Sequence, residues 1–277
     1  MTIPGQVNVT EYLRNDKLPH IWCPGCGHGI VTGALIRAIH AAGLERDKTV
    51  IVSGIGCSSR ASGYMDFDTI HTTHGRALAF ATGIKMARPE LHVIVMTGDG
   101  DAAAIGGNHL IHAARRNIGI TCVCMNNEIY GMTSGQYSPA TPTDAYATTA
   151  PYGNVDTPFD LCELVKAAGA SYVARGTAYQ ARMLEKYILK GLQNDGFSFI
   201  EAIDQCPTYF GRKNKIGDGF AMMKWQQEVS VPVSKARSMT PEELAGKIVV
   251  GELWHRPRVE YTKAYQRVLD KAMGGGR

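Results

Sequence analysis

Two kinds of apolar pattern alternate along the chain. Short runs rich in β-branched residues end in glycine or turn residues, and they predict strands at residues 49–53, 92–97, 120–125, 171–174 and 197–203. Longer segments carry apolar residues at three- and four-residue spacing, and they predict helices at residues 29–42, 77–87, 107–116, 159–168 and 178–193. Such alternation is typical of parallel strands joined by crossover helices. The pattern therefore predicts an α/β fold with a doubly wound, mostly parallel sheet.

The composition changes near Cys206, after which Met, Lys and Pro increase and strand signals fade. We therefore expect an α/β domain over residues 1–206 and a C-terminal extension over residues 207–277 that packs on the same domain. Apolar residues make up 44% of the chain and charged residues 19%, which provides a sizeable core and excludes disordered, collagen-like and coiled-coil proteins.

The net charge of +4 is distributed unevenly. Residues 212–277 contain 13 Lys or Arg against 7 Asp or Glu, whereas residues 1–211 contain 16 against 18. This basic excess could receive an acidic partner protein, and a solvated surface is the simpler interpretation. No basic cluster is interleaved with aromatic residues in the way of a nucleic-acid groove, so we expect no nucleic-acid partner.

We expect a cytoplasmic protein, because neither the N-terminus nor any apolar stretch resembles a secretory or membrane signal. The first residues have neither a basic start nor an apolar run, so they do not resemble a signal peptide. The longest uncharged stretch, residues 18–36, contains Cys23, Pro24 and Cys26 as well as several glycines, which disfavours a membrane-spanning helix. We expect no association with a membrane.

Candidate oxygen ligands follow two of the predicted strands. Strand 92–97 leads into Gly98-Asp99-Gly100-Asp101, and strand 120–125 leads into residues 126–131, which include Asn127. Either half alone has the pattern of a tight turn capped by Asp or Asn. On neighbouring parallel strands, however, the two strand ends lie close together, and a carboxylate, an amide and a carbonyl suit Mg²⁺ bridged to a diphosphate.

Four of the seven cysteines have the spacing of ligands to one metal centre. Cys23 and Cys26 form a Cys-x-x-Cys pair, Cys57 follows strand 49–53, and Cys206 follows strand 197–203. If these strands share a sheet with the Asp99 strand, the four thiolates meet at its carboxyl edge, as a [4Fe–4S] cluster requires.

Three other interpretations of the cysteines remain open. A thioredoxin-type pair would need a strand before the Cys-x-x-Cys motif, and none is predicted there. Structural zinc usually takes two such motifs at short separation, whereas Cys57 and Cys206 stand alone. Buried unreactive thiols are the third interpretation, and it suits the remaining cysteines, which are Cys122, Cys124 and Cys162.

The Asp99 and Asn127 segments resemble the thiamine-diphosphate motif. In that family the Asp, the Asn and a carbonyl two residues later hold Mg²⁺ on the cofactor diphosphate, and here Asp99, Asn127 and the Ile129 carbonyl match. The upstream segment 73–89 resembles the one that holds the cofactor bent, with His74 in place of an apolar wedge. The resemblance implies that His74 lies near the reactive ring; a histidine satisfied at a helix N-terminus is the alternative.

Taken together, these motifs resemble the β subunit of 2-oxoacid:ferredoxin oxidoreductases over nearly the whole chain. Further matching stretches are residues 22–29, 54–59, 74–77, 106–109 and 129–136. The resemblance implies a sheet of the thiamine-diphosphate-binding type. It also implies thiamine-dependent oxidative decarboxylation of a 2-oxoacid, with 2-oxoglutarate favoured, to acyl-CoA and CO₂, or the reverse carboxylation. Electrons would pass singly through a [4Fe–4S] cluster to ferredoxin.

The implied cofactors are thiamine diphosphate, Mg²⁺ and the cluster, and the implied substrates are coenzyme A and the 2-oxoacid. An α subunit would complete a heterodimer or a dimer of heterodimers, and would provide the carboxylate that activates the thiamine. A non-redox thiamine lyase subunit and a zinc-stabilised binding module are the alternatives, and metal analysis separates all three.

The resemblance also assigns roles to individual residues. His74 and Arg60 would face the substrate, although Arg60 is equally well explained as a surface arginine; many relatives carry lysine at the positions of Arg60 and Ser134. The expected metal ligands are Cys23, Cys26, Cys57 and Cys206 for the cluster, and Asp99, Asn127 and Ile129 for Mg²⁺. The expected cofactor-binding residues are Cys57, Ser58, His74, Gly75, Gly98, Asp99, Gly100, Asp101, Asn127, Ile129, Gly131, Met132 and Thr133.

Overall fold

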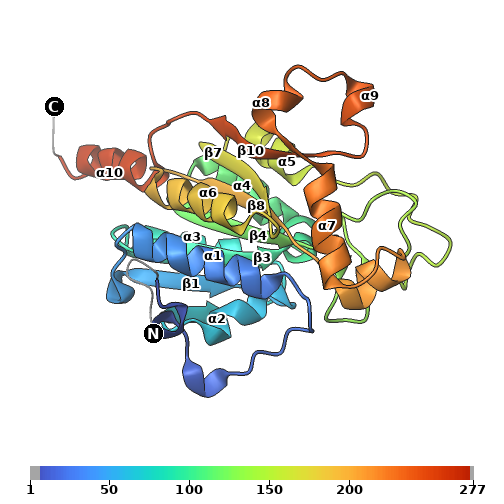
Figure 1. Ribbon diagram of the computed structural model, residues 1–277. Helices are drawn as coiled ribbons and strands as arrows, with labels where there is room; N and C mark the ends of the chain where they lie inside the picture. Colours follow the sequence, from blue (N-terminus) through green and yellow to red (C-terminus); the bar gives the residue numbers. More distant parts are fainter. Residues whose placement is uncertain (1–6, 275–277) are drawn as a thin grey trace.

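Eight strands form one sheet in the computed structural model, which describes residues 7–274 (Figure 1). In spatial order these strands are β2 (Asp68–His71), β1 (Thr49–Ser53), β3 (His92–Gly98), β4 (Ile120–Asn126), β8 (Ser198–Ile203), β7 (Tyr172–Thr177), β10 (Ile248–His255) and β9 (Ser230–Pro232). The first six are parallel to one another. Strand β10 runs antiparallel to β7, and β9 is parallel to β10. The sheet is therefore mostly parallel, as predicted.

Helices cover both faces of the sheet, and the central strands are buried on each side. Helices α1 (His28–Ala41) and α6 (Ala181–Gln193) pack together on one face, whereas α3 (Ala77–Ala87), α4 (Gly107–Arg116) and α5 (Leu161–Ala168) cover the other (Figure 1). Successive side chains of a strand enter opposite cores: in β3, Val95 faces the α3 and α4 side and Met96 faces the α1 and α6 side. This double coverage explains the continuous apolar runs in the sequence.

The five predicted strands and five predicted helices are confirmed, with end points that differ by a few residues. Strand β2 was not predicted, because this edge strand is largely exposed and its sequence Asp-Thr-Ile-His has no apolar pattern. Small elements were also missed, namely α2 (Ala61–Tyr64), α8 (Val233–Ala236), α9 (Pro241–Leu244) and the hairpin of β5 (Ile129–Tyr130) with β6 (Gln136–Tyr137).

Because strand signals fade after Cys206, two strands of the C-terminal part were not predicted. Strands β9 and β10 lie in the C-terminal part and extend the main sheet beyond β7. A register shift between Glu252 and Trp254 interrupts the alternation of β10, which is why its sequence pattern is weak. Helices α7 (Gly219–Val229) and α10 (Tyr261–Ala272) complete this part. The division into residues 1–206 and 207–277 stays a prediction.

The carboxyl ends of four neighbouring strands carry the predicted chemistry. From β1 the chain proceeds to β2 on one side and then to β3 on the other, so the direction of strand order reverses between β1 and β3. Ligands of open parallel sheets bind at such a reversal, outside the carboxyl ends of the strands. Cys57, Asp99, Asn127 and Cys206 follow β1, β3, β4 and β8, which places all four at this edge. Within residues 7–274, no helix has the length and apolar character needed to cross a bilayer.

Candidate functional site

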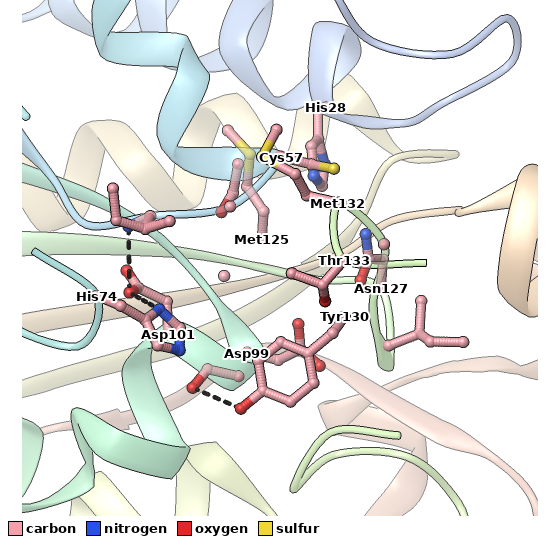
Figure 2. A pocket seen from close by; sticks show the side chains of 17 residues that line it. His28, Cys57, His74, Asp99, Asp101, Met125, Asn127, Tyr130, Met132 and Thr133 are labelled. Carbon is pink, nitrogen blue, oxygen red and sulfur yellow. Dashed lines mark hydrogen bonds and ion pairs between the residues drawn. The ribbon is translucent and has the colours of Figure 1, made fainter. Parts of the chain in front are cut away.

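A cavity of about 290 Å³ opens at this edge of the sheet (Figure 2). Its wall comes from the ends of β3 and β4 and the loops after β1, β2, β3 and β4, together with His28 at the start of α1. The lining residues are His28, Ile55, Gly56, Cys57, Ser58, His74, Gly98, Asp99, Gly100, Asp101, Met125, Asn127, Ile129, Tyr130, Gly131, Met132 and Thr133. No lysine or arginine is among them, so the cavity wall offers carboxylates without a permanent cation.

Asp99 is the most strongly perturbed acid of the cavity. Its side chain is buried, and burial raises the pKa of its carboxyl to about 7, although the Ser138 hydroxyl donates a hydrogen bond to Oδ2. Burial also raises the pKa of the neighbouring Glu128 to about 8, and the Asp99 charge adds to this shift. A buried carboxyl whose pKa lies near neutral pH, as that of Asp99 does, indicates a place where a bound cation would be stabilised.

A sharp turn at the end of β4 presents Asn127 to the cavity. The Asn126 side chain accepts a hydrogen bond from the Glu128 N–H at 3.0 Å, and Glu128 adopts a left-handed φ of 62°. The Asn127 amide is buried and forms no hydrogen bond with residues 7–274, so it is available to a ligand. Ile129, two residues further on, also lines the cavity.

Asp101 connects three segments behind the cavity. One of its carboxylate oxygens, Oδ1, accepts a hydrogen bond from the Gly75 N–H at 2.6 Å. The same oxygen accepts from the Ile55 N–H at 3.3 Å and lies 2.7 Å from His74 Nδ1 (Figure 2). The other, Oδ2, accepts from the Thr97 hydroxyl at 2.8 Å. Gly75 has φ +72°, a left-handed conformation that favours glycine and directs its N–H at Asp101. Asp101 therefore lies against Nδ1 of His74, and Nε2 is the ring nitrogen left for a ligand.

The structure brings the four predicted cluster cysteines together. Charge on one thiolate raises the pKa of others in the set: Cys206 and Cys23 act on Cys57, whose pKa reaches about 11, with burial as the largest cause. Cys206 and Cys57 likewise act on Cys26, whose pKa is raised chiefly by burial. A side-chain atom placed on Gly131 would be 3.5 Å from Cys57 Sγ and 3.7 Å from Cys206 Sγ, so both sulfurs face this glycine.

Close backbone contact places the Cys-x-x-Cys loop beside Cys206. The Gly27 N–H donates to the Gln205 carbonyl at 3.0 Å, and a Cβ on Gly27 would lie only 2.6 Å from the Asp204 Cβ. The Trp22 indole donates to the Cys57 carbonyl at 2.7 Å, which links the loop to the turn after β1. The other three cysteines, Cys122, Cys124 and Cys162, are buried in the core.

Most of the predicted site residues line the cavity or contact a residue that does. Gly75 acts through its hydrogen bond to Asp101. Thr133 lines the cavity, and its hydroxyl donates to Gln136 Oε1 at 2.5 Å. Arg60 is exposed and lies outside the cavity wall, close enough to His71 that its charge adds to the effect of burial in lowering the pKa of that histidine.

Several residues of the site were missed by sequence reasoning. His28 lines the cavity, and its Nδ1 forms a buried hydrogen bond with Asp204 Oδ2. Its position two residues after Cys26 was the available signal. Tyr130 donates from its hydroxyl to the Gly100 carbonyl at 3.2 Å. Ser138 lies 39 residues from its partner Asp99, and no local pattern marks it. The other missed lining residues are Ile55, Gly56 and Met125.

Comparison with known families identifies the class of this site. Residues 54–202 match the family model described as thiamine pyrophosphate enzyme, C-terminal TPP binding domain. The chain thus belongs to the thiamine pyrophosphate enzyme family, and all the cavity-lining residues except His28 lie within the matched region.

Individual relatives show to which group of thiamine pyrophosphate enzymes the chain is similar. The 2-oxoglutarate synthase subunit KorB of Methanothermobacter marburgensis is 56% identical over 264 residues, which cover 95% of this chain and 93% of the relative. The 2-oxoacid:ferredoxin oxidoreductase subunit beta of Saccharolobus solfataricus is 41% identical over 68% of this chain and 62% of its own length. A solved structure, the 2-oxoglutarate:ferredoxin oxidoreductase from Magnetococcus marinus with 2-oxoglutarate, coenzyme A and succinyl-CoA bound, has a TM-score of 0.86 at 32% identity and covers 98% of this chain and 92% of its own. The chain therefore belongs to the 2-oxoacid:ferredoxin oxidoreductase β subunits, as its motifs predicted.

Proposed function

We propose that this chain binds thiamine diphosphate with Mg²⁺ and a [4Fe–4S] cluster. Together with an α subunit it oxidatively decarboxylates a 2-oxoacid, with 2-oxoglutarate favoured, to acyl-CoA and CO₂, and it exchanges electrons with ferredoxin in this or the reverse direction. One observation carries the proposal: Cys57 lines the cavity that contains Asp99 and Asn127, and it also belongs to the group of four cysteines. The cofactor and the cluster would be neighbours.

The donors proposed for Mg²⁺ are the Asp99 carboxylate, the Asn127 amide oxygen and the Ile129 carbonyl. These are the hard oxygen ligands that Mg²⁺ prefers. Asp99 is buried in a cavity wall without lysine or arginine, so a metal ion would supply the positive charge that a buried carboxylate requires. The residues present therefore fit a metal-bound diphosphate.

The spacing of the cysteine sulfurs supports an iron–sulfur cluster over a single zinc ion. Within residues 7–274, no three of the four cysteine sulfurs lie within 4.8 Å of one another. Thiolates about 2.3 Å from one zinc ion would lie closer together than this. A cubane of four irons holds its cysteine ligands further apart, as this arrangement requires.

Residues of the chain position the groups that react. When bound, thiamine diphosphate supplies the decarboxylation chemistry, and the cluster accepts electrons one at a time. Asp101 Oδ1 lies 2.7 Å from His74 Nδ1, so Nε2 is the ring nitrogen that would accept or give a proton at the substrate. Arg60 is the residue we propose to pair with a substrate carboxylate; this requires its exposed side chain to turn toward the cavity.

Exposed apolar residues near the cavity support an α subunit as partner. Ile55 and Met132 line the cavity and are 42% and 45% exposed. Ile105, in the helical turn that begins at Asp101, is 54% exposed and lies against Gly75, the residue after His74. Large apolar side chains at a site are typical of a surface that another protein covers. The resemblance implies that this partner also provides the thiamine-activating carboxylate.

Anaerobic purification of the chain with its α subunit tests the proposal. We expect bound iron and sulfide, bound thiamine diphosphate with Mg²⁺, and coenzyme A-dependent reduction of methyl viologen that is faster with 2-oxoglutarate than with pyruvate. Zinc in place of iron would contradict the cluster assignment. Thiamine-dependent turnover without electron release would contradict the redox function.

A further inference from the structure

The group of four cysteines reaches the protein surface at the Cys-x-x-Cys loop. Cys23, Pro24 and Gly25 are exposed, whereas Cys206 is buried and Cys57 is partly covered. A redox centre held by these residues would therefore be nearest to solvent along this loop. An electron carrier that approaches there would have the shortest path to the centre.

A segment of the C-terminal part lies directly against this loop. A Cβ on Gly25 would lie 3.2 Å from the Gly219 Cα and 3.4 Å from Pro207 Cγ. The chain between these contacts, residues 207–219, connects Cys206 to the start of α7. Arg212 and Lys215 line a shallow depression of this segment together with Pro207 and Gly217.

This segment is basic at its rim and apolar beside the loop. Arg212, Lys213 and Lys215 are exposed, and none of them forms an ion pair within residues 7–274. Phe220, next to Gly219, is 78% exposed. The one acidic residue between them, Asp218, is used to cap α7, where it accepts the Ala221 N–H at 2.9 Å.

We propose that residues 23–25, Arg212, Lys213, Lys215 and Phe220 form a docking surface for a small acidic electron-carrier protein. We call this surface the carrier face. The proposal rests on the proposed function, because it takes the four cysteines to hold the cluster. Each docking event would transfer one electron from the reduced cluster to the oxidised carrier, and no bond would form or break.

The composition of the carrier face suits a transient electron-transfer complex. Three basic residues against the one carboxylate of Asp218 give the rim a net positive charge, which accelerates the encounter with an acidic partner. Screening by salt weakens this effect. An exposed aromatic side chain close to the centre supplies the short-range contact that holds the partner briefly. Together these features favour fast association and fast release.

Neutralising the rim tests the proposal on the assembled enzyme with its α subunit. The variant combines Arg212→Gln, Lys213→Gln and Lys215→Gln, and the probe is an oxidised bacterial-type ferredoxin of net negative charge. At low ionic strength we expect its Kd, measured by titration calorimetry, and its KM in turnover to rise about ten-fold or more. High ionic strength should remove the difference from the unmodified enzyme. The iron content and the rate with methyl viologen should not change.

Two further variants serve as comparisons. One removes positive charge elsewhere on the protein, and the other removes the apolar contact of the carrier face. Arg267→Gln with Lys271→Gln removes exposed, unpaired basic residues from α10, which lies away from α7 in Figure 1, and should leave the ferredoxin Kd unchanged. Phe220→Ala should raise the Kd at low and high ionic strength alike, because its contact is not electrostatic.

Two results would overturn the inference in different ways. An unchanged Kd and KM in the rim variant, with a normal methyl viologen rate, would disprove the carrier face and leave the proposed function intact. Absence of iron and of methyl viologen reduction in the unmodified enzyme would disprove the proposed function, and the carrier face with it.

Discussion

Asp99 is the proposed Mg²⁺ ligand, and its buried charge should also destabilise the cofactor-free protein. One substitution tests both effects. Burial raises the pKa of the Asp99 carboxyl from 3.8 to about 7, so in the cofactor-free protein the ionised form is disfavoured by folding. Asp99→Asn keeps the shape and the acceptor for the Ser138 hydroxyl but removes the charge. We therefore expect the variant to be more stable than the unmodified protein without cofactor, and unable to load it.

The size of the expected gain in stability follows from the pKa shift of Asp99. Each pKa unit corresponds to ~1.4 kcal/mol, so a rise from 3.8 to about 7 destabilises the ionised protein by ~4 kcal/mol. Because the folded pKa is the higher one, this loss begins near the unfolded pKa and is complete above the folded pKa. The gain from Asp99→Asn should therefore be absent near pH 4, grow with pH and reach its full value above pH 7.

Thermal unfolding of the cofactor-free enzyme at several pH values measures this gain. A shift of ~4 kcal/mol corresponds to a rise in Tm of roughly 10 °C for a chain of this size. Thiamine diphosphate with Mg²⁺ should raise the Tm of the unmodified enzyme and leave that of the variant unchanged. Asp101→Asn is the matched control; it should lower the Tm, because Asp101 accepts from Gly75 and Thr97 and pairs with His74. A variant at Asp99 that gains no stability above pH 7, or that still loads Mg²⁺ normally, would refute the reasoning.

Three other sets of substitutions probe the rest of the site. Serine in place of any one predicted cluster ligand should remove the iron; these ligands are Cys23, Cys26, Cys57 and Cys206. Serine at the buried cysteines Cys122, Cys124 or Cys162 should leave the iron content unchanged. A full cluster in Cys206→Ser would show that this ligand is misassigned. Gly27→Ala should also lose iron with every cysteine in place, because the new Cβ would lie 2.6 Å from the Asp204 Cβ and 2.9 Å from the Gln205 nitrogen; Gly63→Ala, with no atom within 4 Å, is the control. Arg60→Met should lower kcat/KM for 2-oxoglutarate about ten- to a hundred-fold, as expected for ~1.5–3 kcal/mol of lost carboxylate contact; equal kinetics of variant and unmodified enzyme with both 2-oxoglutarate and pyruvate would return Arg60 to a surface role.

The local sequence pattern was sufficient to predict the buried strands and helices and to identify the main candidate ligands. Strands such as β3 and β4 are covered on both faces, so their apolar runs mark them in the sequence. The residues after these strands follow from the parallel topology, since carboxyl ends of neighbouring strands meet at one edge. Asp99 and Asn127 could therefore be placed together before the structure was known.

Contacts between segments that are far apart in the sequence could not be predicted from the local pattern. Strand β10 joins the sheet although its alternation is broken, because its pairing with β7 compensates for a weak pattern. Ser138 reaches Asp99, and Asp204 reaches His28, across 39 and 176 residues of sequence. Hydrogen bonding depends on proximity in space, and a single sequence records only proximity along the chain. Tertiary packing alone therefore decided which polar side chains support the ligands that the motifs had identified.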